Sequence, residues 1–182
     1  LVMLKKSGNA RLKALMLSAL FGAGLVMATS IPTVEAATPP SPKLFGKSEV
    51  RSTKLTKFKK WLGVMERYAE EKTRELDKCK LTATNKCEIA KWRIFLKKIA
   101  KHPKDKQIEL VNKYLNKWLY VLDPINYNKK DYWATPRQFM TRNGDCEDYA
   151  IAKYASLAHL GFAKEDMRIV VLQDLNLKVA HA

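Results

Sequence analysis

The sequence predicts an α+β fold in which helices come first along the chain and strands come last. Apolar residues recur every three or four positions over 54–77, 87–101 and 104–122, which is typical of amphipathic helices. Two short apolar runs near the C-terminus, 167–173 and 177–182, are typical of strands, and the first of them is expected to be buried. Helices segregated from strands favour a mainly antiparallel sheet. Because two strands are not a stable sheet, we expect the sheet to be incomplete in this chain.

The N-terminal segment predicts export from the cytoplasm. Basic residues precede an apolar run over 14–28, which is shorter than the roughly 20 residues of a spanning helix. A signal-peptidase cleavage site of the small-residue type follows, ending at Ala36. We therefore predict a signal peptide over 1–36, with an uncleaved membrane anchor as the alternative. A proline-rich linker over 37–53 then leads into one domain over 54–182. The expected location is the periplasm.

The charge balance restricts the expected partners. The 182 residues include 34 Lys and Arg against 18 Asp and Glu, a net charge of +16, which favours anionic surfaces. These basic residues are spread along the predicted helix faces, and no nucleic-acid-binding motif is present. We therefore expect no nucleic acid partner.

The three cysteines suggest one disulfide and one free thiol. Cys79 and Cys87 flank a turn-like segment between two predicted helices, and in an oxidising compartment such a pair predicts a disulfide. A metal site is the alternative, but no second pair of ligands has suitable spacing. Pairing these two cysteines leaves Cys146 as the odd thiol.

Cys146 lies where a helix is expected to begin. Thr135, Pro136 and Gln138 predict a short helix with a capping box, and after a turn at Gly144 a further helix runs over 146–160. A thiol at a helix N-terminus ionises more readily, and His181 on the second predicted strand could face it, as in papain-like enzymes. On spacing alone, however, a buried structural cysteine and a surface histidine are the favoured interpretation.

Short motifs in the last third of the chain favour the catalytic interpretation of Cys146 and His181 instead. They are Trp133-Ala134-Thr135-Pro136, Gly144-Asp145-Cys146-Glu147-Asp148-Tyr149-Ala150, Lys153-Tyr154, Leu160-Gly161, Arg168-Ile169-Val170-Val171 and His181-Ala182. Together they resemble the bacterial transglutaminase-like cysteine proteinases, and among these the LapG-type periplasmic proteases that cleave large surface adhesins and release cells from biofilms. The resemblance implies a papain/transglutaminase-like helix on an antiparallel sheet, behind a helical N-terminal lobe.

The resemblance also implies roles for individual residues. Cys146 would be the nucleophile and His181 the general base and acid. Calcium would bind at Asp145 and Glu147, although plain helix capping is an equally good explanation of the acidic residues around Cys146. The implied partners are an adhesin substrate and an inner-membrane receptor protein.

One element of the family pattern has no counterpart in this sequence. The family's third catalytic residue is an aspartate on a strand after the histidine, whereas Asp174 precedes His181 and does not fit that position. We therefore expect a chain truncated at its C-terminus. The alternatives are a catalytically impaired remnant, a non-catalytic receptor-binding module, or an acyltransferase that uses an amine in place of water.

Overall fold

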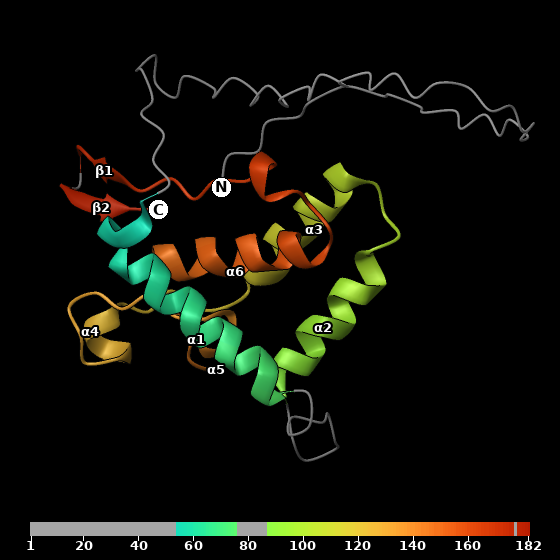
Figure 1. The fold of residues 1–182 in the computed structure, drawn as a ribbon, viewed down its shortest axis with the longest axis horizontal. Helices are drawn as coiled ribbons and strands as arrows, with labels where there is room; N and C mark the ends of the chain where they lie inside the picture. Colours follow the sequence, from blue (N-terminus) through green and yellow to red (C-terminus); the bar gives the residue numbers. More distant parts are fainter. Residues whose placement is uncertain (1–53, 76–86, 177) are drawn as a thin grey trace, which may run out of the picture. The chain divides into compact units, whose positions relative to one another are not determined.

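A computed structural model describes residues 54–75, 87–176 and 178–182 (Figure 1). The predicted signal peptide, the linker and Cys79 lie outside these residues, so the export segment and the Cys79–Cys87 disulfide stay predictions. No helix within the described ranges is both long enough and apolar enough to cross a membrane. The elements are η2 (Leu55–Lys57), α1 (Lys59–Glu75), α2 (Glu88–Ile99), α3 (Lys104–Leu115), α4 (Asp123–Asn126), α5 (Pro136–Arg142), α6 (Cys146–His159), η3 (Lys164–Asp166), β1 (Leu172–Asp174) and β2 (Val179–His181).

The order of helices before strands confirms the predicted α+β class. The first predicted helix is divided, because residues 55–57 form a 3-10 turn before α1 begins at Lys59. The second begins at Glu88, with the Cys87 sulfur accepting a hydrogen bond from the Ala90 backbone N–H at 3.4 Å. The helix periodicity therefore located these elements, while the exact first residues depend on local capping.

The prediction of a third helix over 104–122 is confirmed over 104–115 and wrong over 116–122. Helix α3 ends at Leu115, and Leu119 and Leu122 are 69% and 49% exposed. The backbone N–H of Leu119 donates to Asn143 Oδ1 at 3.0 Å, and that of Val121 donates to the carbonyl of Gly144 at 2.9 Å. These bonds to a distant turn replace the helical ones, so the chain continues as an extended segment.

The apolar core joins α2, α3 and α5 to the helix that begins at Cys146. Helix α6 packs against α3 and α5, and α2 packs against α3 and α5. Within this core the indole N–H of Trp92 donates to the hydroxyl of buried Ser156 on α6 at 2.8 Å. The buried core residues are Cys87, Ile89, Trp92, Leu96, Ile99, Val111, Leu115, Phe139, Met140, Ala152, Leu157 and Met167. Helix α6 is thus fixed by the helices around it.

The predicted capping of the two C-terminal helices is confirmed in detail. Thr135 Oγ1 accepts from the Gln138 N–H at 3.2 Å, and the Gln138 side chain accepts from the Thr135 N–H at 2.9 Å, which completes a capping box. Asp145 is the N-cap of α6. Beyond its C-terminus, Gly161 has the left-handed φ of +78° that glycine tolerates best.

The two strands form an antiparallel ladder that pairs Leu172 with His181. The prediction of a buried strand over 167–173 is wrong, because β1 covers only Leu172–Asp174 and Val171 and Leu172 are 55% and 40% exposed. Only Met167 is buried, where it enters the helical core. Within the described part of the chain β1 pairs with β2 alone, so the sheet there has two strands.

Candidate active site

The turn before Cys146 is held by tertiary hydrogen bonds. Asn143 has a left-handed φ of +68°, and its carbonyl accepts from the side-chain amide of Asn126 at 3.1 Å. Gly144 forms a parallel bridge with Tyr120, beside the hydrogen bond from the Val121 N–H. These contacts bind the turn to the segment that follows α3, so Cys146 is presented at the first position of α6.

The thiol of Cys146 is half-buried and lies beside a carboxylate. Its Sγ donates to Glu147 Oε2 at 3.1 Å. Burial, followed by this hydrogen bond, raises the pKa of the thiol to about 11, and the charges of Glu147 and Asp145 act in the same direction. A backbone hydrogen bond from Ala182 opposes the rise. With these groups alone the thiol is protonated at neutral pH, so a nucleophilic role requires a compensating positive charge.

His181 lies on the exposed end of β2. The backbone of the next residue, Ala182, lowers the pKa of the Cys146 thiol and therefore lies near it. The ladder therefore brings the end of the chain near the thiol, with His181 one residue away from Ala182.

Five carboxylates gather around the start of α6. They form overlapping groups whose ligand atoms lie within 4.8 Å of one another, one of which also includes the Cys146 sulfur. Burial is the main cause that raises the pKa of Asp123 and of Asp145, and in Asp145 the hydrogen bond and charge of Glu147 add to it. The carboxylates are Asp123, Asp131, Asp145, Glu147 and Asp148.

Two buried oxygen atoms of this cluster have no hydrogen-bond partner, namely Oδ1 of Asp123 and Oδ1 of Asp145. A buried acceptor without a partner is costly, and carboxylate oxygens are the ligands that hard cations prefer. The only ion pair in the described part of this cluster joins Asp131 to Lys60 on α1. The carboxylates of this cluster therefore fit a divalent cation, and Asp123 lies in one group with Asp145 and in another with Glu147.

Asp148 has a different position from the other acidic residues. Its side chain is completely buried and accepts from the Ala134 N–H at 2.6 Å and from the Asp145 N–H at 3.4 Å. Burial raises the pKa of this carboxyl to about 8. Asp148 thus ties the first turn of α6 to the segment before α5.

The sequence analysis named Cys146, Asp145 and Glu147, which the structure places together, but it did not name Asp123 or Asp131, which lie in the same acidic cluster. Asp123 is 1% exposed and accepts from the Tyr132 backbone N–H. In the sequence it was visible only as part of an Asp-Pro break after an apolar pattern. Residues on separate loops carry no spacing signal, so only the fold brings them to the same turn.

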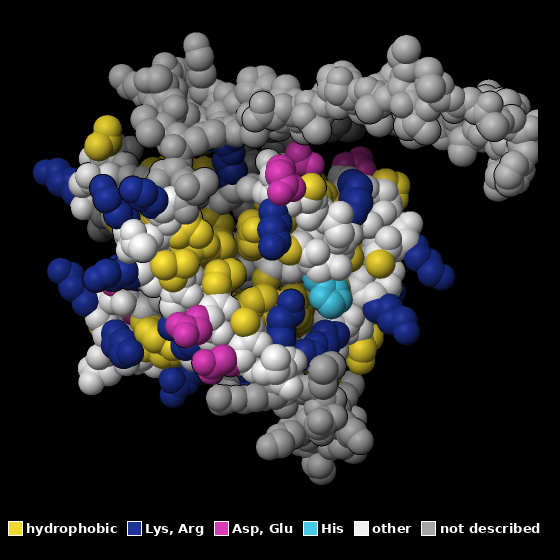
Figure 2. All heavy atoms as spheres, viewed as in Figure 1, with side chains coloured by type: hydrophobic (Ala, Val, Ile, Leu, Met, Phe, Trp, Pro, Cys, Tyr) yellow, Lys and Arg dark blue, Asp and Glu magenta, His cyan; other side chains and the backbone are white. Residues whose placement is uncertain are grey.

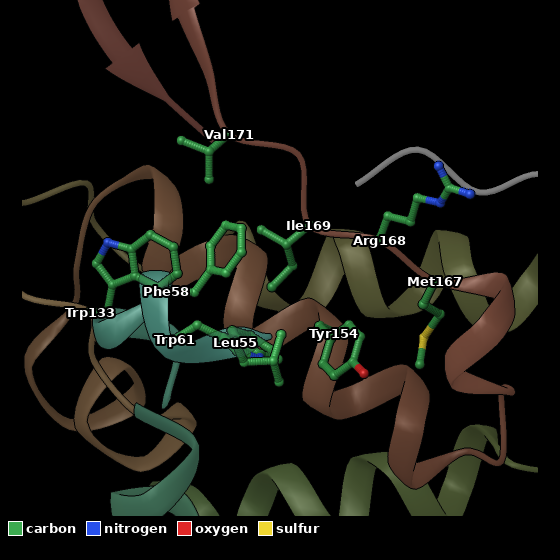
Figure 3. A pocket seen from close by; sticks show the side chains of 9 residues that line it. All are labelled: Leu55, Phe58, Trp61, Trp133, Tyr154, Met167, Arg168, Ile169 and Val171. Atoms are coloured by element: carbon green, nitrogen blue, oxygen red, sulfur yellow. The ribbon is translucent and has the colours of Figure 1, made fainter. Parts of the chain in front are cut away.

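An apolar pocket lies between the start of α1, helix α6 and the segment that leads into β1 (Figure 3). Its volume is about 390 Å³. Figure 3 shows Phe58, Ile169 and Val171 on one side of this space and Tyr154 on α6 on the other. The lining residues are Leu55, Phe58, Trp61, Trp133, Tyr154, Met167, Arg168, Ile169 and Val171.

Figure 2, in the orientation of Figure 1, shows a hydrophobic area within this face, with Lys and Arg side chains around it. Several pocket residues contribute exposed apolar surface, since Leu55, Phe58 and Val171 are 45%, 57% and 55% exposed. Contiguous exposed apolar surface of this kind is typical of contact with other molecules.

Comparisons with known proteins show the family of the chain. The family model of the bacterial transglutaminase-like cysteine proteinases (BTLCP) matches residues 71–182. Solved structures of Legionella pneumophila LapG, including an EGTA-treated and a calcium-bound form, match with 35% sequence identity and a TM-score of 0.50. The match to LapG covers 61% of this chain and 61% of that protein. No curated protein sequence matches the chain.

Proposed function

Since this chain belongs to the bacterial transglutaminase-like cysteine proteinases, we propose that it is a periplasmic cysteine endopeptidase that cleaves a large surface adhesin. Cleavage would release the adhesin and so control the detachment of cells from biofilms. The observation that carries this proposal is the position of Cys146 at the first turn of α6, with the end of β2 at its thiol. An inner-membrane receptor that sequesters the protease is part of the same proposal.

The proposed reaction begins with proton transfer from the Cys146 thiol to His181. The sulfur then attacks a peptide carbonyl carbon, an S–C bond forms, and the carbonyl electron pair moves to the oxygen. When this intermediate collapses, the C–N bond breaks and His181 returns the proton to the leaving amine. Water, deprotonated by His181, hydrolyses the remaining thioester. The backbone N–H of Cys146, at the helix start, is one donor available to the developing oxyanion.

The test of this function is incubation of the protein with the purified cleavage region of an adhesin encoded by the same organism. A hydrolase produces two fragments whose masses add up to the substrate plus one water, whereas an acyltransferase incorporates an amine. Treatment with iodoacetamide should stop the reaction, since it alkylates thiols. Adhesin that stays intact while the protein binds the receptor would contradict the protease and favour the non-catalytic receptor-binding module.

We propose that the acidic cluster holds calcium, with Asp145 and Glu147 as ligands and Asp123 as a further donor. The unpartnered oxygens of Asp123 and Asp145 support this assignment, as does the calcium-bound form of the similar LapG. When bound, the ion supplies positive charge that offsets the field of the carboxylates near Cys146.

Adding calcium is expected to raise the melting temperature of the protein. An ion that binds only the folded state at a hundred times its Kd stabilises by about 2.7 kcal/mol. The double variant Asp145→Asn with Glu147→Gln should lose this response, while Asp166→Asn, an exposed carboxylate on η3, should keep it. Differential scanning calorimetry with calcium and with EGTA measures the melting temperature of the wild-type protein and of both variants. An undiminished response in the double variant would place the ion elsewhere.

A further inference from the structure

The peptide group between Trp133 and Ala134 is hydrogen-bonded at both of its ends. Its carbonyl, which belongs to Trp133, accepts from Arg67 Nη2 on α1 at 2.6 Å. Its N–H, which belongs to Ala134, donates to Oδ1 of the completely buried Asp148 on α6 at 2.6 Å. Because arginine is always charged, its bond is of the charge-assisted kind, which is about twice as strong as a neutral one. One peptide group therefore links α1 to the first turn of α6.

The other carboxylate oxygen of Asp148 extends this link to the start of α6. Asp148 Oδ2 accepts from the backbone N–H of Asp145 at 3.4 Å. Asp145 is the N-cap of α6, directly before Cys146, and it is one of the proposed calcium ligands. A continuous path of hydrogen bonds thus runs from the Arg67 guanidinium to the residue that caps the helix of the nucleophile.

Helix α1 gives Arg67 a fixed base. The ring of Trp61 meets that of Tyr154 on α6 edge to face, with ring centroids 5.5 Å apart. Val64, one turn before Arg67, is completely buried. The guanidinium of Arg67 also lies over the ring of Tyr132, 4.9 Å from the ring centroid. Because α1 packs on α6 through Trp61 and the guanidinium has two contacts, Arg67 is held against the segment before α5.

The surroundings of Arg67 favour a role in the site over a role in stability alone. Its Nε atom is buried and has no hydrogen-bond partner within the described ranges. A buried donor without a partner destabilises a folded protein, so an apolar side chain would fill this place at lower cost. Such departures from the rules of stable packing are expected at functional sites.

We propose that Arg67 is a positioning residue of the calcium site, which acts on Asp148 and Asp145 through the peptide group that it binds. The assignment rests on the proposed function, in which calcium binds beside Cys146. With the guanidinium on its carbonyl, the peptide group cannot rotate, so its N–H stays directed at Asp148. Asp148 in turn holds the backbone of Asp145, and the carboxylate of Asp145 therefore starts from a fixed point. These contacts set the position of an oxygen ligand before the ion arrives.

The test is the calcium affinity of the full chain, measured by isothermal titration calorimetry with calcium chloride at a temperature where every variant is folded. Arg67→Met keeps a long side chain but donates no hydrogen bond, so the Kd for calcium should rise by about 10-fold, the lower end of the usual effect of losing an outer-shell partner. Arg67→Lys keeps the charge and a donor but not the planar fork of arginine, so its Kd should rise less. A role in stability alone would lower the melting temperature and leave the Kd of the folded protein unchanged.

Lys72→Met is the matched control. Lys72 is exposed on the same helix, and its ammonium lies over the ring of Tyr68, also on α1, 5.0 Å from the ring centroid. This variant removes the same charge from α1 without touching the peptide group, so its Kd should equal that of the wild type.

A wild-type Kd in a folded Arg67→Met variant would overturn the proposal. So would an equal rise in Arg67→Met and Lys72→Met, which would show that net charge sets the affinity. If Arg67→Met does not fold, Arg67→Lys decides in its place, and a wild-type Kd there overturns the assignment. Wild-type protein that binds no calcium overturns both this inference and the calcium proposal. The measurement needs no adhesin, so the expected affinities in a protein that cleaves no adhesin would contradict the protease function alone.

Discussion

Replacing Cys146 with alanine is expected to lower kcat for adhesin cleavage by about 10⁶, the size of effect measured when the nucleophile of a catalytic triad is removed. The reason is that no thioester can form without the sulfur, and Cys146 is the free cysteine among the described residues. Single-turnover assays with the adhesin fragment measure this loss. The melting temperature should change little, because Cys146 is only half-buried and its one side-chain donation is to Glu147.

Asp174→Asn is the control for this variant. Asp174 lies on the strand opposite β2, but it precedes His181 and does not fit the family position of the orienting aspartate. Its carboxylate accepts from the Asn176 N–H at 2.8 Å, a bond that an asparagine side chain also makes. Activity within about twofold of wild type is expected, by comparison with ordinary surface changes of about ±0.5 kcal/mol. Cleavage that persists in Cys146→Ala would exclude the proposed nucleophile.

Replacing Gly144 with alanine is expected to destabilise the domain by about 2–3 kcal/mol, which corresponds to a fall in Tm of about 10 °C. A Cβ at this position would lie 2.7 Å from the Cβ and 2.8 Å from the Cγ of Asp148. Asp148 cannot move aside easily, since it is completely buried and bonded to the Ala134 N–H. The turn that presents Cys146 would have to shift, so cleavage should also be lost.

Gly63→Ala is the matched control. Gly63 lies inside α1, and an added Cβ would meet only the Nη1 atom of the Arg67 side chain, at 3.4 Å. Because glycine is disfavoured in helices, this variant should gain up to about 0.5–1 kcal/mol. Thermal unfolding measures both variants in one series. Equal stability of Gly144→Ala and Gly63→Ala would show that the turn tolerates a side chain.

Sequence signals that lie a few residues apart correctly predicted most of the helices and their caps. The capping box of Thr135 and Gln138 could be recognised because its hydrogen bonds join residues three positions apart. The position of Cys146 at the start of α6 followed for the same reason, since Gly144 and Asp145 are local signals for a turn and an N-cap. The apolar periodicity wrongly predicted helix over 116–122, because backbone hydrogen bonds from this segment to Asn143 and Gly144 replace the helical ones.

The sequence by itself determined the α+β class, the start of the helix that carries Cys146, and the family, because each of these depends on residues close together in the chain. Only the tertiary structure decided that Asp123 joins Asp145 and Asp148 in one acidic group, and that Asp123 joins Asp131 and Glu147 in another. The physical reason is that these contacts join separate loops. They form only when α3 and α5 pack on α6 and bring the segment after α3 against the turn before Cys146.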